Sequence, residues 1–337
     1  MPWQQDCRRI NDLSISRELR LRRIHSLVLE RYFAEKGLMR IMNNRNFPSW
    51  MLLLSIVATV GVPSANAQSK TLTAREVVAR IQAHVGIPWM AETVDTFKAG
   101  NPDTEVKGIA VTMMATLDVL QRAAAAGQNL IITHEPTFYN HQDKPVELEQ
   151  KENDPVLAAK RAFIAEHGLV IWRFHDHQHR MKADQIETGT AHALGWERFQ
   201  DSGNQYVFAI PETNLEQLVS DLKSRLKIHV MRVVGDPKLT VRKVALVPGA
   251  SGFAKETRTL EISDLQVLIT GEPREWETVE YVADAVTEGK PKALIILSHI
   301  PSEQSGMEEC TRWLKTFVSE VPVEFVAARD PFWPSKE

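Results

Sequence analysis

Three segments of the chain end in side chains that can bind a metal ion. The run "NLIITHE" ends in His134 and Glu135, "IWRFHDHQH" ends in a histidine-rich cluster at 175–179, and "IILSHIPSE" carries His299 and Glu303. Imidazole and carboxylate ligands together suit Zn, Mn, Fe or Ni better than Mg or Ca. These residue types predict a site for one or two divalent ions, which can activate water for hydrolysis.

The spacing within two of these segments favours convergence on one ion. His175 and His179 fall on one side of the backbone in a helix and in a strand alike, whereas His177 joins them only in a strand. His299 and Glu303 bracket a proline and converge if a helix begins between them. Each segment alone could be a strand end, a solvated cluster or a helix start, but three together favour a metal site. No role is expected for the histidines at His84, His141, His167, His192 and His229.

Apolar runs alternate with amphipathic segments of about 10 to 15 residues, which is typical of α/β proteins. Strands are expected at 107–115, 129–134, 169–179, 243–252, 265–272, 292–299 and 323–328. Helices are expected at 71–87, 116–128, 154–168, 183–196, 214–227, 275–289 and 305–320. The layout predicts two α/β lobes, at 72–200 and 201–337, with helices flanking each sheet. Ligands gather at the carboxyl ends of such strands, where the three metal-binding segments lie.

The first 70 residues differ in composition from the α/β pattern of the rest of the chain. Residues 1–41 are rich in Arg and are interpreted as a mis-assigned upstream extension. Residues 42–67 have the charge, apolar core and Ala65-Asn66-Ala67 end of a signal peptide. The apolar core is too short to span a bilayer comfortably. We expect cleavage near Ala67 and a secreted or periplasmic protein without a stable membrane anchor; the alternative is an uncleaved tail or a single anchor.

The charge balance and the cysteine content limit which partners and which disulfides are expected. Cleavage would remove 10 of the 40 basic and 5 of the 43 acidic residues, leaving a net charge of −8. This balance argues against nucleic acid as a partner and leaves a small molecule as the expected substrate. Cys310 would then be the single cysteine, so no internal disulfide could form.

Four motifs, in order, resemble the Nif-three-like family, also called YbgI-like or dinuclear metal-centre hexameric proteins. They are "NLIITHEP", "HDHQH", "LQVLITGE" and "LSHIPSE", within roughly residues 72–332. The resemblance implies a two-lobed α/β fold, two metal ions per subunit and a ring of six subunits. By residue matching, the implied metal ligands are His134, Glu135, His179, His299 and Glu303.

The chain departs from the family pattern in three of the four motifs. The paired histidines of the first motif become His134 and Glu135, and the aspartate that ends the second becomes His179. Both replacements can still bind metal. In the third motif Glu272 replaces an aspartate, and a trailing histidine is absent near Trp276.

Two functions are expected to compete. One is a metal-dependent hydrolase of a nucleotide-like or other small substrate, with His175, Asp176, His177 or Glu272 moving the proton. The family resemblance attaches a GTP cyclohydrolase label to this activity. The other is a non-catalytic metal-binding scaffold that forms a ring.

Overall fold

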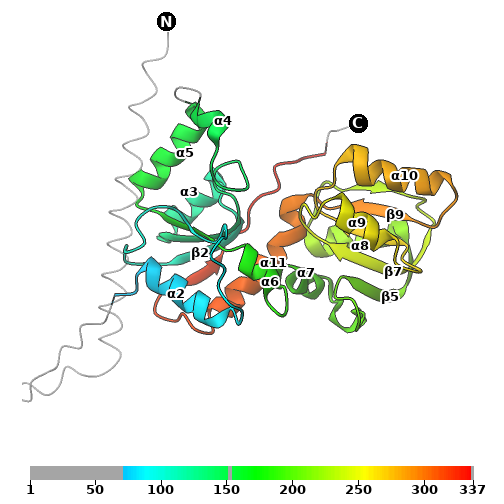
Figure 1. Ribbon diagram of the computed structural model, residues 1–337, viewed down its shortest axis with the longest axis horizontal. Helices are drawn as coiled ribbons and strands as arrows, with labels where there is room; N and C mark the ends of the chain where they lie inside the picture. Colours follow the sequence, from blue (N-terminus) through cyan, green and yellow to red (C-terminus); the bar gives the residue numbers. More distant parts are fainter. Residues whose placement is uncertain (1–70, 151–153, 335–337) are drawn as a thin grey trace, which may run out of the picture. The chain divides into compact units, whose positions relative to one another are not determined.

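The computed structural model describes residues 71–150 and 154–334, and the expected upstream extension (1–41) and signal peptide (42–67) lie outside them. The described residues form two five-stranded sheets, each flanked by helices (Figure 1). The predicted α/β fold class is therefore confirmed. Within this described part, no helix has both the length and the apolar character needed to cross a membrane.

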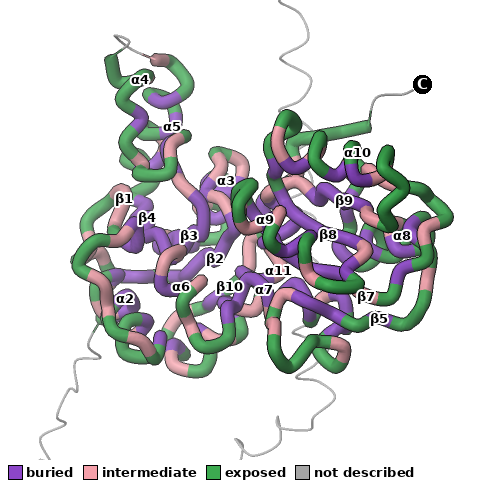
Figure 2. Tube along the Cα trace, turned by 45° about the vertical axis from the view of Figure 1, so that its right-hand side comes forward, coloured by how far each residue is buried: buried purple, intermediate pink, exposed green. Residues whose placement is uncertain are grey.

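The first sheet has the strand order β1-β4-β3-β2-β10, and its neighbours are parallel except for β1 against β4. Its strands are β1 (Phe97–Ala99), β2 (Ile109–Met114), β3 (Leu130–Glu135), β4 (Val170–Arg173) and β10 (Val323–Phe325). Strands β2, β3 and β4 are almost wholly buried (Figure 2). Both faces are covered, as parallel strands require.

Helices cover the two faces of this sheet. Helices α2 (Ala74–His84) and α11 (His299–Leu314) pack on the face that carries Val111 and Ile132. The opposite face packs on α3 (Leu117–Ala125) and α5 (Pro155–Glu166). The short α4 (Val146–Glu149) precedes α5. Local signals predicted α2, α3 and α5; Thr73, for example, forms the capping box with Glu76 that starts α2.

The second sheet has the order β5-β7-β8-β9-β6, with β5 and β6 antiparallel to their neighbours. Its strands are β5 (Val207–Asn214), β6 (Arg232–Val234), β7 (Thr240–Val247), β8 (Val267–Thr270) and β9 (Ala293–Ile296). Its helical elements are α7 (Gln185–Leu194), the 3-10 turn η1 (Glu197–Phe199), α8 (Leu215–Leu226), α9 (Phe253–Leu260), the π-helix η2 (Glu275–Val279) and α10 (Glu280–Thr287). One face packs on α7 and α8 and the other on α9 and α10.

The end of the chain returns to the first sheet. The sequence layout assigned all of 201–337 to the second lobe, but β10 pairs in parallel with β2. Helix α11 makes the return, because Met307, Cys310 and Leu314 on its apolar face belong to the core of the first sheet. The helix begins beside the second sheet, directly after β9, and thereby links the two sheets.

Two glycines let α7 and α11 cross closely. A Cβ on Gly189 would lie 2.6 Å from the Cα of Gly306, and a Cβ on Gly306 would lie 2.4 Å from the Cα of Ile186. The Thr190 hydroxyl also donates to the carbonyl oxygen of Ser302 at 3.0 Å. This crossing sets the distance between the first turn of α11 and the start of α7.

Candidate metal centre

Strand β3 delivers His134 and Glu135 to a buried position. The His134 side chain is fully buried, and its Nδ1 lies 2.9 Å from Gln178 Oε1 and 3.1 Å from the carbonyl oxygen of Phe174. Because both partners are acceptors, Nδ1 carries the proton and Nε2 keeps its lone pair. Gln178 is oriented in turn, since its amide nitrogen donates to Gln185 Oε1 at 3.0 Å.

The histidine-rich segment is a helix, not the end of a strand. Strand β4 stops at Arg173, and α6 (Asp176–Arg180) follows. The Asp95 carboxylate accepts the backbone N–H groups of residues 175, 176 and 177 at 2.6, 3.0 and 2.9 Å. The expected strand at 169–179 is therefore wrong beyond residue 173, because the group that starts the helix comes from a distant part of the chain.

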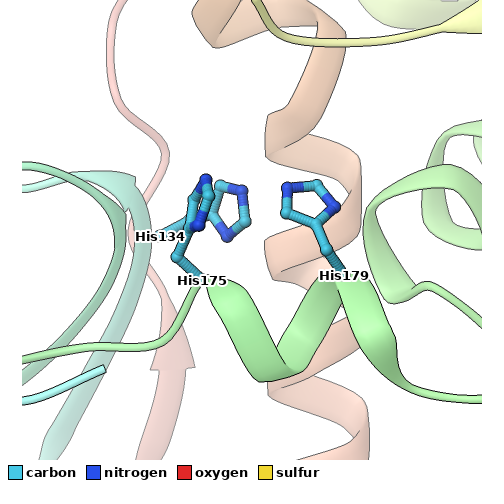
Figure 3. A group of neighbouring side chains, drawn as sticks. All are labelled: His134, His175 and His179. Carbon is cyan, nitrogen blue, oxygen red and sulfur yellow. The ribbon is translucent and has the colours of Figure 1, made fainter. Parts of the chain in front are cut away.

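Helical spacing gathers three imidazoles (Figure 3). His175 and His179, both at α6, face His134 from β3, and the three ring centroids are 4.7 to 4.9 Å apart. One donor nitrogen from each ring lies within 4.8 Å of the other two. Since the segment is helical, the pair that the spacing favoured in either conformation reaches the site together.

The structure does not bring His177 to this cluster. Its Nδ1 lies 2.6 Å from Asp95 Oδ2, and its Nε2 accepts the backbone N–H of Met90 at 2.9 Å. The ring is fully buried and stacks on Trp89 with centroids 3.5 Å apart. Both ring nitrogens are thus engaged in holding α6 in place.

Helix α11 supplies the third segment. It begins at His299, with Pro301 in its first turn, where a missing N–H costs nothing. His299 Nε2 lies 3.2 Å from Glu303 Oε2 and 3.6 Å from Glu135 Oε1. The same oxygens lie 3.7 Å from His134 Nε2 and 3.5 Å from His175 Nε2, respectively. Imidazoles and carboxylates therefore alternate around a common centre.

We call six residues the donor set: His134, Glu135, His175, His179, His299 and Glu303. Two groups within it could each hold an ion, namely His134 with His175 and His179, and His134 with Glu135 and Glu303. Two ligands of a tetrahedral ion with bonds of about 2.1 Å lie about 3.4 Å apart. The nitrogen–oxygen distances of 3.2 to 3.7 Å around the centre match that spacing.

Buried polar atoms without partners also indicate a cation. Among the described residues, His134 Nε2 and Glu303 Oε2 are buried and make no hydrogen bond. Leaving such a group unpaired costs about 1 to 3 kcal/mol, and more when it is charged. A lone pair and a carboxylate oxygen that face each other at 3.7 Å cannot satisfy one another, but both can bind one positive ion.

The outward nitrogens of the imidazoles are held by acceptors. His175 Nδ1 lies 2.9 Å from Asp176, His179 Nδ1 lies 2.8 Å from Asp184, and His299 Nδ1 lies 2.8 Å from Glu272. Metal-binding histidines commonly donate their second N–H to such carboxylates, which fixes the tautomer and leaves Nε2 for the ion. Glu272, whose role the sequence left open, orients His299.

The pKa values of His134 and His299 are shifted in opposite directions. Burial, with His179 and His175 nearby, holds the pKa of His134 well below its usual value, so this ring is neutral. Burial also lowers the pKa of His299, but the neighbouring carboxylates of Glu135, Glu272 and Glu303 outweigh it and raise the pKa to about 12. Without an ion, the positive charge among the carboxylates is therefore a proton on His299.

The glycine-rich turn after β7 determines where Glu303 can lie. Gly249 has a φ of +69°, and a Cβ there would lie 2.1 Å from Glu303 Oε1. Its N–H donates to the Ser302 hydroxyl at 3.1 Å, and its carbonyl accepts the N–H of Glu272 at 2.9 Å. The second sheet thus contributes to the site through this turn and through Glu272.

A buried arginine lies behind Glu135. Arg173 is fully buried; its Nε donates to the carbonyl oxygen of His134 at 2.9 Å, and its Nη2 lies 3.4 Å from Glu135 Oε2. One oxygen of Glu135 faces this guanidinium and the other faces His175 and His299. Sequence reasoning missed Arg173, Asp95, Gln178 and Asp184, because only the tertiary contacts bring them to the donor set.

The fold and the donor set together define an α/β protein with a candidate His/Glu metal centre at the carboxyl ends of parallel strands. The family model described as Duf34/NIF3 (NGG1p interacting factor 3) matches residues 73–331. The chain belongs to this family.

Individual relatives are distant in sequence. The chain is 23% identical over 245 residues to a "GTP cyclohydrolase 1 type 2 homolog" of Chlamydia muridarum, covering 70% of this chain and 89% of that protein. It resembles the structure of a Bacillus cereus protein related to NIF3, with a TM-score of 0.64 and 15% identity over 79% of this chain and 100% of the other. Staphylococcus aureus hypothetical protein SA1388 gives a TM-score of 0.62 and 18% identity, with coverages of 79% and 100%. These structures support the fold.

Proposed function

We propose that this protein is a metal-dependent hydrolase with two divalent ions, acting on a small phosphate-containing or nucleotide-like substrate. The observation that carries the proposal is a pair of buried atoms, His134 Nε2 and Glu303 Oε2, which make no hydrogen bond and face each other at 3.7 Å inside a set of six donors. Zn, Mn, Fe and Ni suit a set of four imidazoles and two carboxylates. The nucleotide-like substrate is suggested by the name "GTP cyclohydrolase 1 type 2 homolog" that two relatives carry.

Divalent ions bound by the donor set would supply Lewis acidity and an activated water. The protein's own residues hold the set in register: Asp176, Asp184 and Glu272 accept the outward N–H groups, and Gly249 leaves room for Glu303. The Oε1 oxygen of Glu135, which faces the centre between His175 and His299, can accept a hydrogen bond from water there.

One observation favours the alternative of a non-catalytic metal-binding scaffold. Of the residues expected to move a proton, His177 has both ring nitrogens engaged and Asp176 binds His175, Thr93 and Val94. His175 lies within the donor set, so it is more readily a ligand than a base. A scaffold needs only the ions and the assembly.

Metal analysis and a substrate panel separate the two functions. The purified protein should retain close to two equivalents of a divalent ion and hydrolyse a member of a panel of phosphoesters, amides, lactones and nucleotides. His134→Ala should abolish turnover and bound metal while circular dichroism shows a folded protein. Metal retention without any turnover would favour the scaffold, and a protein that binds no ion under any loading condition would refute both.

Export and assembly into a ring of six are further parts of the proposal, supported by the sequence of residues 42–67 and by the family resemblance. N-terminal sequencing of protein from the secreted or periplasmic fraction would test cleavage near Ala67. Light scattering of the same sample would test the six-subunit assembly.

A further inference from the structure

The loop that follows β3, residues 136–145, is tied down at several points. Asp143 Oδ1 accepts the backbone N–H groups of Thr137 and Phe138 at 2.6 and 3.0 Å. Lys98 Nζ lies 3.4 Å from the other oxygen of Asp143. Arg173, which also binds Glu135, donates to the carbonyl oxygen of His141. The backbone of His141 is thus fixed by the same guanidinium that lies behind the donor set.

The imidazole of His141 contacts the donor set edge-on. Its ring centroid lies 5.5 Å from that of His175, with an angle of 79° between the planes. No role was expected for His141 from the sequence, but the structure places it beside His175 of the donor set. In the described part of the chain its ring makes no hydrogen bond, in contrast to the rings of His134, His175, His179 and His299, whose Nδ1 atoms all have acceptors.

His141 lies beside His175, one of the three partly exposed histidines of the donor set. The side chains of His175, His179 and His299 are 18%, 32% and 19% exposed, whereas those of His134 and Glu303 are 0% and 4% exposed. The residue His141 itself is exposed. A ligand that binds ions at the centre from the solvent side and passes His175 therefore meets an imidazole whose ring nitrogens are free.

We propose that His141 is a substrate-contacting residue whose ring N–H donates a hydrogen bond to an oxyanion, of the phosphate class, bound at the metal centre. This inference rests on the proposed function and deepens it, because it assigns a residue to the recognition of the substrate's anionic group. The fixed backbone of His141 limits the entropy that is lost when its ring N–H makes a directional contact. An uncharged imidazole and an imidazolium can both make this contact.

The test measures binding of inorganic phosphate to the metal-loaded protein by isothermal titration calorimetry, with the metal content of each sample determined in parallel. His141→Ala should weaken phosphate binding about tenfold or more, as expected for a hydrogen bond to a charged group. His141→Asn keeps an N–H donor and should recover part of the loss. His192→Ala is the matched control, because His192 is an exposed histidine bound to Glu197 and should leave phosphate affinity unchanged.

Each alternative outcome is distinct. Equal phosphate affinity in His141→Ala and wild type would overturn the contact, and so would a wild type that holds its metal but does not bind phosphate. A drop in metal content in His141→Ala would make His141 a ligand rather than a substrate contact. If the wild type holds no metal, the proposed function itself fails and this contact fails with it.

Discussion

Substituting Gly249 by alanine should displace the carboxylate of Glu303, a proposed metal ligand, without changing any residue of the donor set. The new Cβ would lie 2.1 Å from Glu303 Oε1 and 3.0 Å from its Cδ. Ordinary contacts of carbon begin at about 3.5 Å, so the carboxylate must move by about 1 Å or the turn must shift. Such sites tolerate displacements of only about 0.5 Å. Glu303 has little room to adjust, because its side chain is 4% exposed.

Two separate costs are expected from Gly249→Ala. An L-residue at a φ of +69° costs about 1 to 2 kcal/mol of stability, whatever its surroundings. The displaced carboxylate should lower metal affinity about 10- to 100-fold, the range seen when residues supporting metal ligands are changed. The first cost appears in chemical denaturation of the metal-free protein, and the second in competition titrations with a chromophoric chelator.

Gly289→Ala separates the two costs. Gly289 has a similar φ of +77°, but a Cβ there would meet no atom within 4 Å. This variant should lose comparable stability in the metal-free state and keep wild-type metal affinity. If both variants bind metal as the wild type does, either Glu303 is not a ligand or the turn yields freely, and the geometric reasoning is refuted.

Three further predictions follow from protonation and hydrogen bonding at the site. Because the pKa of His299 is raised to about 12, the metal-free site carries a proton at neutral pH that an ion must displace. Metal affinity should therefore rise with pH. Calorimetry in buffers of different ionisation enthalpy should show this proton release, and Glu272→Gln should alter it. His179→Ala should lose bound metal with little change in stability. His177→Ala should instead lose about 1 to 3 kcal/mol of unfolding free energy, because it breaks buried hydrogen bonds. Equal metal loss in the two variants would contradict the assignment of their roles. Burial raises the pKa of Asp176, but hydrogen bonds from Val94, His175 and Thr93 outweigh it and lower the pKa to about 2. The stabilising contribution of this carboxylate should be complete above about pH 4, its pKa in the unfolded chain, and be lost as the pH falls toward 2. Asp176→Asn should therefore flatten that part of the acid denaturation curve.

Local sequence signals determined most of the elements that hold the site. Strands β2, β8 and β9 fall within the predicted apolar runs, β3 and β7 overlap theirs, and α2, α3, α5, α7 and α8 fall within predicted amphipathic segments. Such elements follow from hydrophobic period and caps, which are encoded within a few residues. The short edge strands β1 and β6 were missed, because three residues carry too little periodicity to stand out.

Conformation at the histidine-rich segment depended on a residue far away in sequence. No residue within 169–179 predicts a helix start, because the carboxylate that accepts the first N–H groups of α6 belongs to Asp95, about 80 positions earlier. That one contact decides whether His177 joins His175 and His179 or points to Trp89. The start of α11 was also predicted six residues too late, because a proline after His299 reads as a break although it is suited to a first turn.

Residue types at the ends of three segments, by themselves, determined that this chain would carry a histidine and carboxylate site on an α/β scaffold. Which atoms face the centre was decided only by the tertiary structure. Asp184, Glu272 and Gln178 fix the ring orientations, Arg173 takes one oxygen of Glu135, and Gly249 leaves room for Glu303. The physical reason is that periodicity and capping act over a few residues, whereas coordination geometry depends on side chains that meet only when distant segments pack together.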